Sequence, residues 1–551
     1  MPSIDAEAVA AGIRAILLPP EDTISPRKVL LSHPKLLYHF YRSRDFAPVW
    51  VQSFEPSSPM GKFLAVLEHV DEHGLDPAMY GSERISRLRS SFLSAPSAAD
   101  SVLPLLDVAI SDAAISLDTD LRAGVFAPMD LYPENFNLPV KPRRSSASVL
   151  AAVDIAEHFR TIAPRNGRYT SLQNALRLLR QMARGDTLET IPFPGGKIEP
   201  GQHATILGRI DRRIRFLRQL RLGGSPPLPE NAFTSRYDAK GYTVYDSALV
   251  ENVKEFQRNH GLLDDGVIGE RTVKMLNMPL AERIRLVRLN LERCRWLNFP
   301  DTGSYVRINI PEFYLHAVHD DRTVERIKVC LGMRYTVVIR GHRPMNYQTP
   351  MTWGYISAIV LNPPWYVPPS IAARETYYAA LKDSTYLRRH NYRIVRGDSV
   401  LRSGSIRLKE YDPNNLPFRF VQGPGEANAL GRIKFVFDNP FGIYLHDTPK
   451  RKPFTYATRT VSHGCIRVEE PMRLLSFLLT PRDRWTLDSV RQYLDRTQAT
   501  KTFSLARKTP IYIDYMTVWV DTDGVIQFRD DVYGKNRVLA HAFAALPGAK
   551  W

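Results

Sequence analysis

The sequence predicts a multidomain α+β protein, and three observations support that class. The chain has 551 residues, several times the length of a typical domain, so more than one hydrophobic core is expected. Apolar residues recur with helical spacing from residue 13 to about residue 222, whereas from about residue 303 they alternate with period two, as in β-strands. Between these regions, residues 223–229 read Gly-Gly-Ser-Pro-Pro-Leu-Pro, which is typical of a linker.

The composition is that of a folded, soluble protein. Hydrophobic residues make up 44% and charged residues 24%, which excludes a wholly disordered or membrane-embedded chain. The 74 Lys and Arg exceed the 57 Asp and Glu, for a net charge of +17, which favours a polyanionic partner such as nucleic acid, anionic lipid or cell-wall polymer. No run of about 20 apolar residues occurs, and residues 6–18 are interrupted by Arg14, so neither a membrane anchor nor a signal peptide is expected.

Residues 1–225 are predicted to form a helical scaffold domain. Helical spacing of apolar residues is clear in residues 64–75 and 108–117. Residues 206–222 predict a helix with one apolar stripe surrounded by arginines. That helix has two interpretations: a docked helix with a solvated basic face, or a face that binds anions.

Residues 235–280 predict a small helical module. Asp246 is placed to cap a first helix, and the turn at residues 264–269 leads to a second helix through Val273 and Leu276. An ordinary helical hairpin with a glycine-rich turn fits the same pattern. Residues 281–302 predict a connecting basic amphipathic helix.

Residues 303–490 predict a β-rich domain. The alternation lapses between residues 363 and 431, where a proline-rich entry, a helical stretch and a glycine-rich exit predict an inserted lid or capping subdomain. Strand character returns afterwards, and residues 491–551 are expected to form a C-terminal segment that packs on the scaffold or on the β-rich domain.

The sharpest local motif is Ser462-His463-Gly464-Cys465-Ile466-Arg467, which follows a segment ending in Tyr444-Leu445-His446-Asp447. A cysteine nucleophile needs a thiolate, a base for its proton and donors that hold the oxyanion. His446 is the candidate base at the end of a strand, and Gly464 permits close backbone approach. Arg467 adds a positive charge that either lowers the thiol pKa or holds the loop.

This motif, together with His446, resembles the signature of the YkuD-type L,D-transpeptidases. The wider chain is similar to their large YcbB-like subgroup, in which a helical scaffold and a peptidoglycan-binding repeat precede a catalytic domain with a substrate-capping insertion. Residues 256–276 resemble that repeat, and residues 362–368, 415–420, 423–431 and 444–449 resemble the subgroup's catalytic domain. The resemblance covers most of the chain from Leu36 onward.

The resemblance implies a two-step acyl transfer on peptidoglycan stem peptides. Cys465 would attack the carbonyl that joins the third stem residue to the terminal D-alanine, release D-alanine and form a thioester. The side-chain amine of a second stem would then take the acyl group and form a 3–3 cross-link. His446 would move the protons, with the backbone carbonyl of Asp447 orienting its ring and the Asp447 side chain not required.

The resemblance also assigns the surrounding residues. His463 is expected to make a supporting hydrogen bond, and Tyr444 and Trp365 to line the substrate channel, although Trp365 fits core packing of the insertion equally well. The site residues expected are therefore Cys465, His446, Asp447, Gly464, His463 and Arg467 for catalysis, and Tyr444, Trp365 and Ser462 for substrate binding.

The expected partners are peptidoglycan stem peptides and glycan strands, with carbapenem β-lactams as inhibitors and with peripheral association to inner-membrane wall-synthesis machinery as a further option. A periplasmic location follows from that substrate. No cofactor, metal or nucleic-acid partner is expected. Residues 423–431 lack the Lys-Ser/Thr ending of a phosphate-binding loop, and the alternation of a strand places His316 and His319 on opposite faces.

Three alternatives stay open at this stage. If water or another amine took the acyl group from the enzyme, the protein would be an L,D-carboxypeptidase, an exchange enzyme or a cross-linker of other stem positions. The basic helices and the binding repeat also fit a non-catalytic peptidoglycan-binding scaffold protein, and the charge alone fits nucleic-acid binding. Cys294 and Cys330 are expected to be buried apolar residues without a chemical role.

Overall fold

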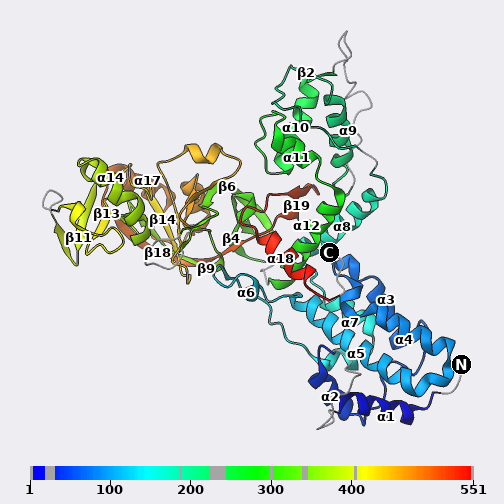
Figure 1. The fold of residues 1–551 in the computed structure, drawn as a ribbon. Helices are drawn as coiled ribbons and strands as arrows, with labels where there is room; N and C mark the ends of the chain where they lie inside the picture. The colour runs from blue at the N-terminus through cyan, green and yellow to red at the C-terminus, as the bar shows by residue number, and fades with distance from the viewer. Residues whose placement is uncertain are drawn as a thin grey trace. The chain divides into compact units, whose positions relative to one another are not determined.

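The computed structural model describes residues 4–18, 31–186, 189–223, 243–297, 302–337, 345–401 and 406–547. The chain folds into two units (Figure 1). One comprises Met1–Leu131, Pro139–Asn298 and Thr517–Trp551, and is mostly helical; the other comprises Tyr132–Leu138 and Phe299–Met516, and is mostly β. The predicted multidomain α+β class is confirmed.

The helical unit begins with a scaffold packed around one long helix, α5 (Ala99–Ala123). This helix is buried along most of its length because apolar residues cover more than one of its faces. Trp50, Phe63 and Phe159 pack in the same core. The remaining scaffold helices are α1 (Ala6–Leu17), α2 (Pro34–Arg42), α3 (Pro59–Glu68), α4 (Ser82–Ser94), α6 (Pro128–Leu131), α7 (Ile155–Ile162) and α8 (Gly167–Ala183).

The predicted basic helix is α9 (Leu207–Arg218), and it is docked. Ile210, Ile214 and Leu217 are buried. Part of the basic face is neutralised, because Arg215 pairs with Asp211 at 2.9 Å and Arg218 pairs with Glu255 at 2.9 Å. The solvated basic face expected from the sequence is therefore only partly solvated.

The small helical module contains α10 (Ser247–Asn259) and α11 (Glu270–Leu276). The side chain of Asp246 caps α10 by accepting the Leu249 N–H at 2.9 Å, as predicted. The side-chain amide of Gln257 accepts the Gly266 N–H and donates to the Val267 carbonyl, both at 2.9 Å, which holds the glycine-rich turn in place. The long helix α12 (Leu280–Trp296) follows directly.

The unit is completed by short strands and the C-terminal helix. These are β2 (His203–Ala204) paired with β3 (Thr243–Val244), β19 (Val518–Val520) paired with β20 (Ile526–Phe528), and α18 (Lys535–Ala544). Buried Asn290 of α12 joins the two parts of the unit, since its side-chain oxygen accepts the Thr517 N–H at 2.9 Å.

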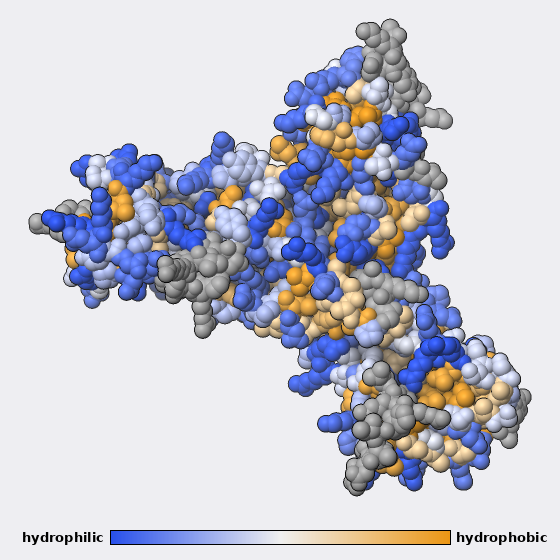
Figure 2. Space-filling model, in the orientation of Figure 1, coloured by the Kyte–Doolittle hydropathy of each residue, from blue (hydrophilic) through white to orange (hydrophobic). Residues whose placement is uncertain are grey.

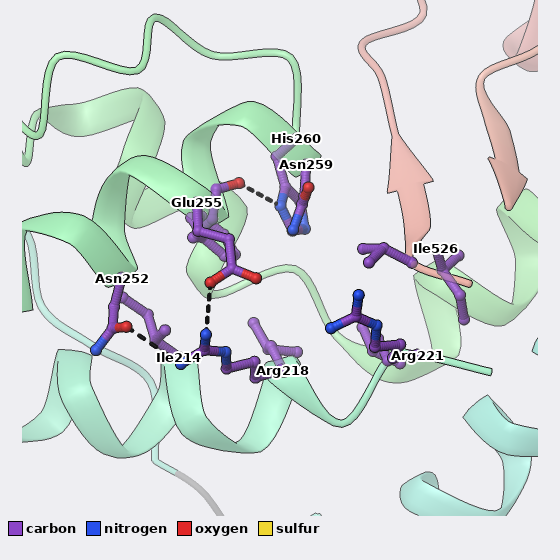
Figure 3. Close-up of a pocket in the computed structure, with 12 residues that line it drawn as sticks. Ile214, Arg218, Arg221, Asn252, Glu255, Asn259, His260 and Ile526 are labelled. Atoms are coloured by element: carbon purple, nitrogen blue, oxygen red, sulfur yellow. Dashed lines mark hydrogen bonds and ion pairs between the residues drawn. The ribbon is translucent and has the colours of Figure 1, made fainter. Parts of the chain in front are cut away.

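A cavity in this unit lies between α9, α10 and the start of β20, with Arg218, Asn252, Glu255 and His260 in its wall (Figure 3). The polar groups of the wall pair with one another: Arg218 with Glu255 and Asn252, and the His260 ring with the carbonyl of Phe256. We therefore interpret the cavity as a packing gap at the interface between the docked helix α9 and the small module.

The β-rich unit is a sheet of ten strands in the described residues, with the order β1-β9-β14-β15-β17-β6-β5-β4-β18 and with β16 paired to β6. Strand β18 also pairs with β9, so the sheet closes on itself. In Figure 1, β9, β14 and β18 lie side by side accordingly. The strands are β1 (Phe136–Asn137), β4 (Ser304–Asn309), β5 (Tyr314–His319), β6 (Arg322–Gly332), β9 (Met351–Leu361), β14 (Ile433–Phe437), β15 (Leu445–His446), β16 (Thr460–Ser462), β17 (Ile466–Val468) and β18 (Lys501–Asp514).

Residues 501–514 are a strand of this sheet, although the sequence analysis places them in a separate C-terminal segment beyond residue 490. Strand β18 pairs in parallel with β4 through Ile511↔Val306 and antiparallel with β9 through Lys501↔Leu361. The buried residues Ile511 and Ile513 share the core of the β-rich unit. The helices α16 (Pro471–Leu478) and α17 (Leu487–Arg496) precede this strand.

The insertion forms a subdomain with its own sheet and core. It leaves the main sheet after Leu361 of β9 and returns at Ile433 of β14, and these two residues pair directly, so the insertion does not interrupt the sheet. Its core includes Val367, Tyr377 and Phe420. Its elements are β10 (Trp365–Tyr366), α13 (Pro369–Ile371), the π-helical turn η6 (Ala372–Thr376), α14 (Tyr377–Lys382), α15 (Tyr386–Arg389), β11 (Tyr392–Arg396), β12 (Ser399–Leu401) and β13 (Arg419–Gln422).

Hydrophilic residues predominate on the face of the molecule drawn in Figure 2, over both units. Within the described ranges, no helix combines the length and the apolar composition that a membrane crossing requires.

Candidate active site

The candidate site lies on one face of three neighbouring strands, β14, β15 and β17. His446 pairs directly with Lys434 of β14 on one side and with Arg467 of β17 on the other. Directly paired residues project from the same face of a sheet, as do residues two apart. Tyr444 and Cys465 therefore lie on this face too, and the Ile466 N–H bonded to the Tyr444 carbonyl at 3.0 Å extends the ladder to them.

His446 is buried and held in one tautomer. Its Nδ1 lies 2.6 Å from the backbone carbonyl oxygen of Asp447, which can only accept a hydrogen bond. Nδ1 therefore carries the hydrogen, and Nε2 has a free lone pair. Burial, together with the charges of Arg467 and Lys434, lowers the pKa of His446 to about 3, so the ring is neutral at physiological pH.

Cys465 is protonated in the resting site. Burial raises the pKa of its thiol above the ordinary value, while hydrogen bonds from the backbone and hydroxyl of Tyr444 and the charges of Lys434 and Arg467 act in the opposite direction. Burial and the contact with Cys465 raise the pKa of Tyr444, so its hydroxyl keeps its hydrogen and donates it. The site thus holds a neutral thiol, a neutral imidazole and a neutral phenol.

The loop that carries Cys465 is fixed by two hydroxyl groups. The buried Ser462 hydroxyl donates to the carbonyl of Cys465 at 2.6 Å and accepts the Gly464 N–H at 3.3 Å. The Thr349 hydroxyl donates to the Gly464 carbonyl at 2.9 Å. Gly464 has φ +115°, a conformation that residues with a Cβ rarely adopt, which explains the glycine before the cysteine.

His463 joins the loop to the inserted subdomain. Its Nε2 lies 2.8 Å from a carboxylate oxygen of Glu375 in η6, and its ring meets the ring of Tyr347 edge-on at 4.8 Å. The hydrogen bond with His463 lowers the pKa of Glu375. His463 thus hydrogen-bonds Glu375, a partner that the sequence did not indicate, and its supporting role stays a prediction.

The carboxylate of Asp447 is occupied by hydrogen bonds from Arg432, Thr448 and Arg451. One oxygen accepts the backbone N–H of Arg432 at 2.9 Å, and the other accepts those of Thr448 at 2.7 Å and the Arg451 guanidinium at 2.8 Å. Gly431 packs against it: φ is +62° there, and an added Cβ would lie 2.3 Å from Oδ2. This carboxylate fixes the loop after β15, and only the main chain of Asp447 touches His446.

Arg467 and Trp365 complete the surroundings. Arg467 is partly buried, and its charge lowers the pKa of Cys465. Trp365 hydrogen-bonds the hydroxyl of Tyr444 and also packs against the core of the insertion. Both interpretations of Trp365 are thus compatible with its position.

The sequence analysis missed Lys434, Glu375 and Thr349. Lys434 is detectable in hindsight as a charged residue inside the apolar strand Ile433–Phe437 that pairs with the strand of His446. Glu375 and Thr349 lie far from the motif in sequence, and no local pattern marks them.

The other cysteines and the two histidines raised by the sequence analysis are buried or make local contacts. Cys294 and Cys330 are buried, and burial raises the pKa of Cys330 to about 11. His316 bonds Glu312 at 2.9 Å, and His319 bonds Ser304 at 2.8 Å. Within the part of the chain that the structure describes, no group of three or more His, Cys, Asp or Glu is arranged to hold a metal ion.

Three segments of the chain match known protein-family models. Residues 303–513 match the L,D-transpeptidase catalytic domain, YkuD; residues 35–176 match a "Scaffold domain"; and residues 234–276 match a "Putative peptidoglycan binding domain". The chain thus carries a YkuD L,D-transpeptidase catalytic domain together with a scaffold domain and a peptidoglycan-binding domain.

A protein of Haemophilus influenzae named "Putative L,D-transpeptidase" is 27% identical over 298 residues, which are 53% of this chain and 57% of that protein. The match therefore spans little more than half the length of this curated relative. A crystal structure of the L,D-transpeptidase (residues 123–326) from Xylanimonas cellulosilytica aligns with 16% identity and a TM-score of 0.20, covering 59% of this chain and 100% of that one.

Proposed function

We propose that the protein is a peptidoglycan L,D-transpeptidase with Cys465 as its nucleophile and His446 as its base. The observation that carries the proposal is the arrangement on β15 and β17, where a buried His446 with a free Nε2 shares one sheet face with Cys465. The match to the YkuD catalytic domain supports the reaction class, and the peptidoglycan-binding domain supports the substrate.

In the first step the Sγ of Cys465 attacks the carbonyl carbon of the third residue of a donor tetrapeptide. The thiol proton moves to Nε2 of His446 and then to the amide nitrogen, whose bond to the carbonyl carbon breaks. D-Alanine leaves with that proton, and a thioester remains on Cys465.

In the second step the side-chain amine of an acceptor stem attacks the thioester carbonyl. The amine gives a proton to Nε2 of His446, the C–S bond breaks, and the proton returns to the sulfur. The product is a 3–3 cross-link, and the enzyme recovers its neutral thiol and imidazole.

Two donors are placed to stabilise the oxyanion of both tetrahedral intermediates. The backbone N–H of Cys465 has no partner among the described residues, and the Tyr444 hydroxyl points to the cysteine side chain. Both donors are neutral and fixed before substrate arrives, which is the arrangement that favours developing negative charge.

Water in place of the amine would make the protein an L,D-carboxypeptidase, and other amines would give exchange or cross-links at other stem positions. The inserted subdomain, which reaches the cysteine loop through Glu375, is where acceptor choice would be made. A purely binding scaffold role is the non-enzymatic alternative, and the intact Cys465–His446 pair disfavours it. We place the activity in the periplasm, in contact with stem peptides and glycan strands and in peripheral association with inner-membrane wall-synthesis machinery.

Acylation by a carbapenem tests the nucleophile directly. The thiol of Cys465 adds to the β-lactam carbonyl and opens the ring without losing an atom, so intact-protein mass rises by the full mass of the drug. The Cys465→Ala variant is the control and should gain nothing. A folded wild-type protein without an adduct would contradict the proposal.

A further inference from the structure

Lys434 is a partly buried cation at the site face of the sheet. It pairs directly with His446 across β14 and β15, and its Nζ lies 3.7 Å from the centre of the Tyr444 ring. Neighbouring residues Ile433 and Phe435 are buried on the opposite face of β14, so the lysine side chain is fixed towards the site by the pleat of the strand.

Lys434 has no carboxylate partner in the described ranges, whereas Arg307 of the same unit pairs with Asp514 at 2.8 Å. Glu375, which contacts the cysteine loop, pairs with His463. Withdrawing an ammonium from water costs free energy unless an anion compensates it. The site therefore carries an uncompensated positive charge beside its nucleophile.

We propose that Lys434 binds the free α-carboxylate of the donor stem, on the residue that leaves. This inference rests on the proposed function. In such a donor the carboxylate is attached to the carbon next to the departing amide nitrogen, about 3–4 Å from the carbonyl carbon under attack. A carboxylate held over the Tyr444 ring by Lys434 would thus place the scissile carbonyl at Cys465. It would also select stems that end at the fourth residue over stems with a longer or amidated end.

The competing role for Lys434 is to stabilise the thiolate of Cys465 without touching substrate. Two small alkylating agents separate the roles, because iodoacetate carries a carboxylate next to its reacting carbon and iodoacetamide carries a neutral amide in its place. In both reactions the sulfur forms a bond to carbon and iodide leaves, so a change in thiol ionisation affects the two rates equally. The ratio of the rates therefore reports only the attraction of the carboxylate.

The experiment measures both alkylation rate constants at Cys465 by peptide mass spectrometry, with Cys465→Ala as the blank. In Lys434→Met the iodoacetate-to-iodoacetamide ratio should fall about five- to tenfold, the loss of one charge-assisted contact. It should stay within about twofold of wild type in Lys434→Arg, which keeps the charge, and in Lys501→Met, which removes an exposed lysine of β18. An unchanged ratio in a folded Lys434→Met protein would overturn the proposal.

If Lys434→Met fails to fold, the wild-type protein still gives the answer. Raising salt should lower the iodoacetate rate and leave the iodoacetamide rate unchanged, and equal responses would overturn the proposal. A second readout compares donors: Lys434→Met should raise KM for the tetrapeptide with a free carboxylate and leave KM for its carboxamide unchanged. Absence of any Cys465-dependent peptide product would contradict the proposed function alone, since the alkylation ratio does not depend on it.

Discussion

The imidazole of His446 donates its Nδ1 hydrogen to the backbone carbonyl of the next residue, Asp447, across 2.6 Å. A backbone acceptor orients the ring without adding a negative charge beside it, so the pKa of His446 stays low, at about 3, under the influence of burial and of nearby cations. A carboxylate acceptor would stabilise the imidazolium instead. The resting pair is therefore neutral thiol and neutral imidazole, and under the proposed mechanism the proton moves only when substrate is in place.

This neutral pair predicts how the reactivity of Cys465 depends on pH. Because burial raises the pKa of the thiol and lowers that of His446, no group of the pair titrates between pH 5 and pH 8. The rate of alkylation by iodoacetamide should rise about tenfold per pH unit from pH 6 to above pH 8, following the thiolate fraction. Reactions quenched at a series of times and analysed by mass spectrometry measure this alkylation rate at each pH. A plateau reached below pH 7 would show a preformed thiolate–imidazolium pair and contradict the account.

Ser462→Ala tests how the cysteine loop is held. The substitution removes the donor to the Cys465 carbonyl and the acceptor of the Gly464 N–H in a buried site, which should lower the free energy of unfolding by about 1–3 kcal/mol. Turnover should fall as well, because Cys465 loses its fixed position. Denaturant unfolding and steady-state kinetics measure the two effects. Ser399→Ala, at an exposed position of β12, is the matched control, and an equal response of both variants would refute the role given to Ser462.

Glu375→Gln tests the contact between the inserted subdomain and the cysteine loop. The change weakens the pairing with His463. The effect should be modest because the Glu375 carboxylate is largely exposed. We expect KM for a tetrapeptide donor to rise about two- to fivefold, with kcat and iodoacetamide alkylation of Cys465 nearly unchanged. A loss of alkylation as large as the loss of turnover would show that Glu375 positions the cysteine loop itself.

Glu292→Gln tests the stability of the helical unit. The Glu292 carboxylate is fully buried, pairs with Arg295 at 2.7 Å and accepts the Val125 N–H at 2.7 Å and the Trp296 indole N–H at 2.9 Å. Removing its charge leaves the Arg295 guanidinium uncompensated, at a cost of about 3–5 kcal/mol. Thermal unfolding should show a clear fall in midpoint, with alkylation of Cys465 unaffected below that midpoint. A midpoint equal to that of wild type would contradict the stabilising role of the buried pair.

Much of the site was predictable because its residues lie close together in sequence. His446 ends one short strand and Cys465 directly precedes another, and a cysteine with glycine before it and arginine two positions after it is a dense local signal. The helix caps and the insertion were predictable for the same reason: Asp246 at the start of α10 and the proline-rich entry before β10 act within a few residues. Features formed within a few residues of the chain can therefore be recognised from the sequence.

Contacts between distant strands were not predictable from the sequence. Strand β18 joins the main sheet through pairing with β4 and β9, partners about 200 and 150 residues earlier, and the register of such pairing is set by packing in the folded state. Lys434 belongs to the site because of its cross-strand pairing with His446, and Glu375 because the insertion folds back on the loop. The alternation in Ile433–Phe437 showed which strand residues share a face, and not which strand lies beside them.

The central claim is that Cys465 transfers an acyl group from one stem peptide to another. Wild-type protein and the variants Cys465→Ala and Cys330→Ala are incubated with disaccharide-tetrapeptides, and products are sequenced by tandem mass spectrometry. A 3–3 cross-linked dimer that forms with wild type and with stable Cys330→Ala, and that is absent with Cys465→Ala, is the predicted result. Tripeptide as the only product would show that water, and not a second stem, takes the acyl group. Dimer formation that persists in Cys465→Ala would contradict the account.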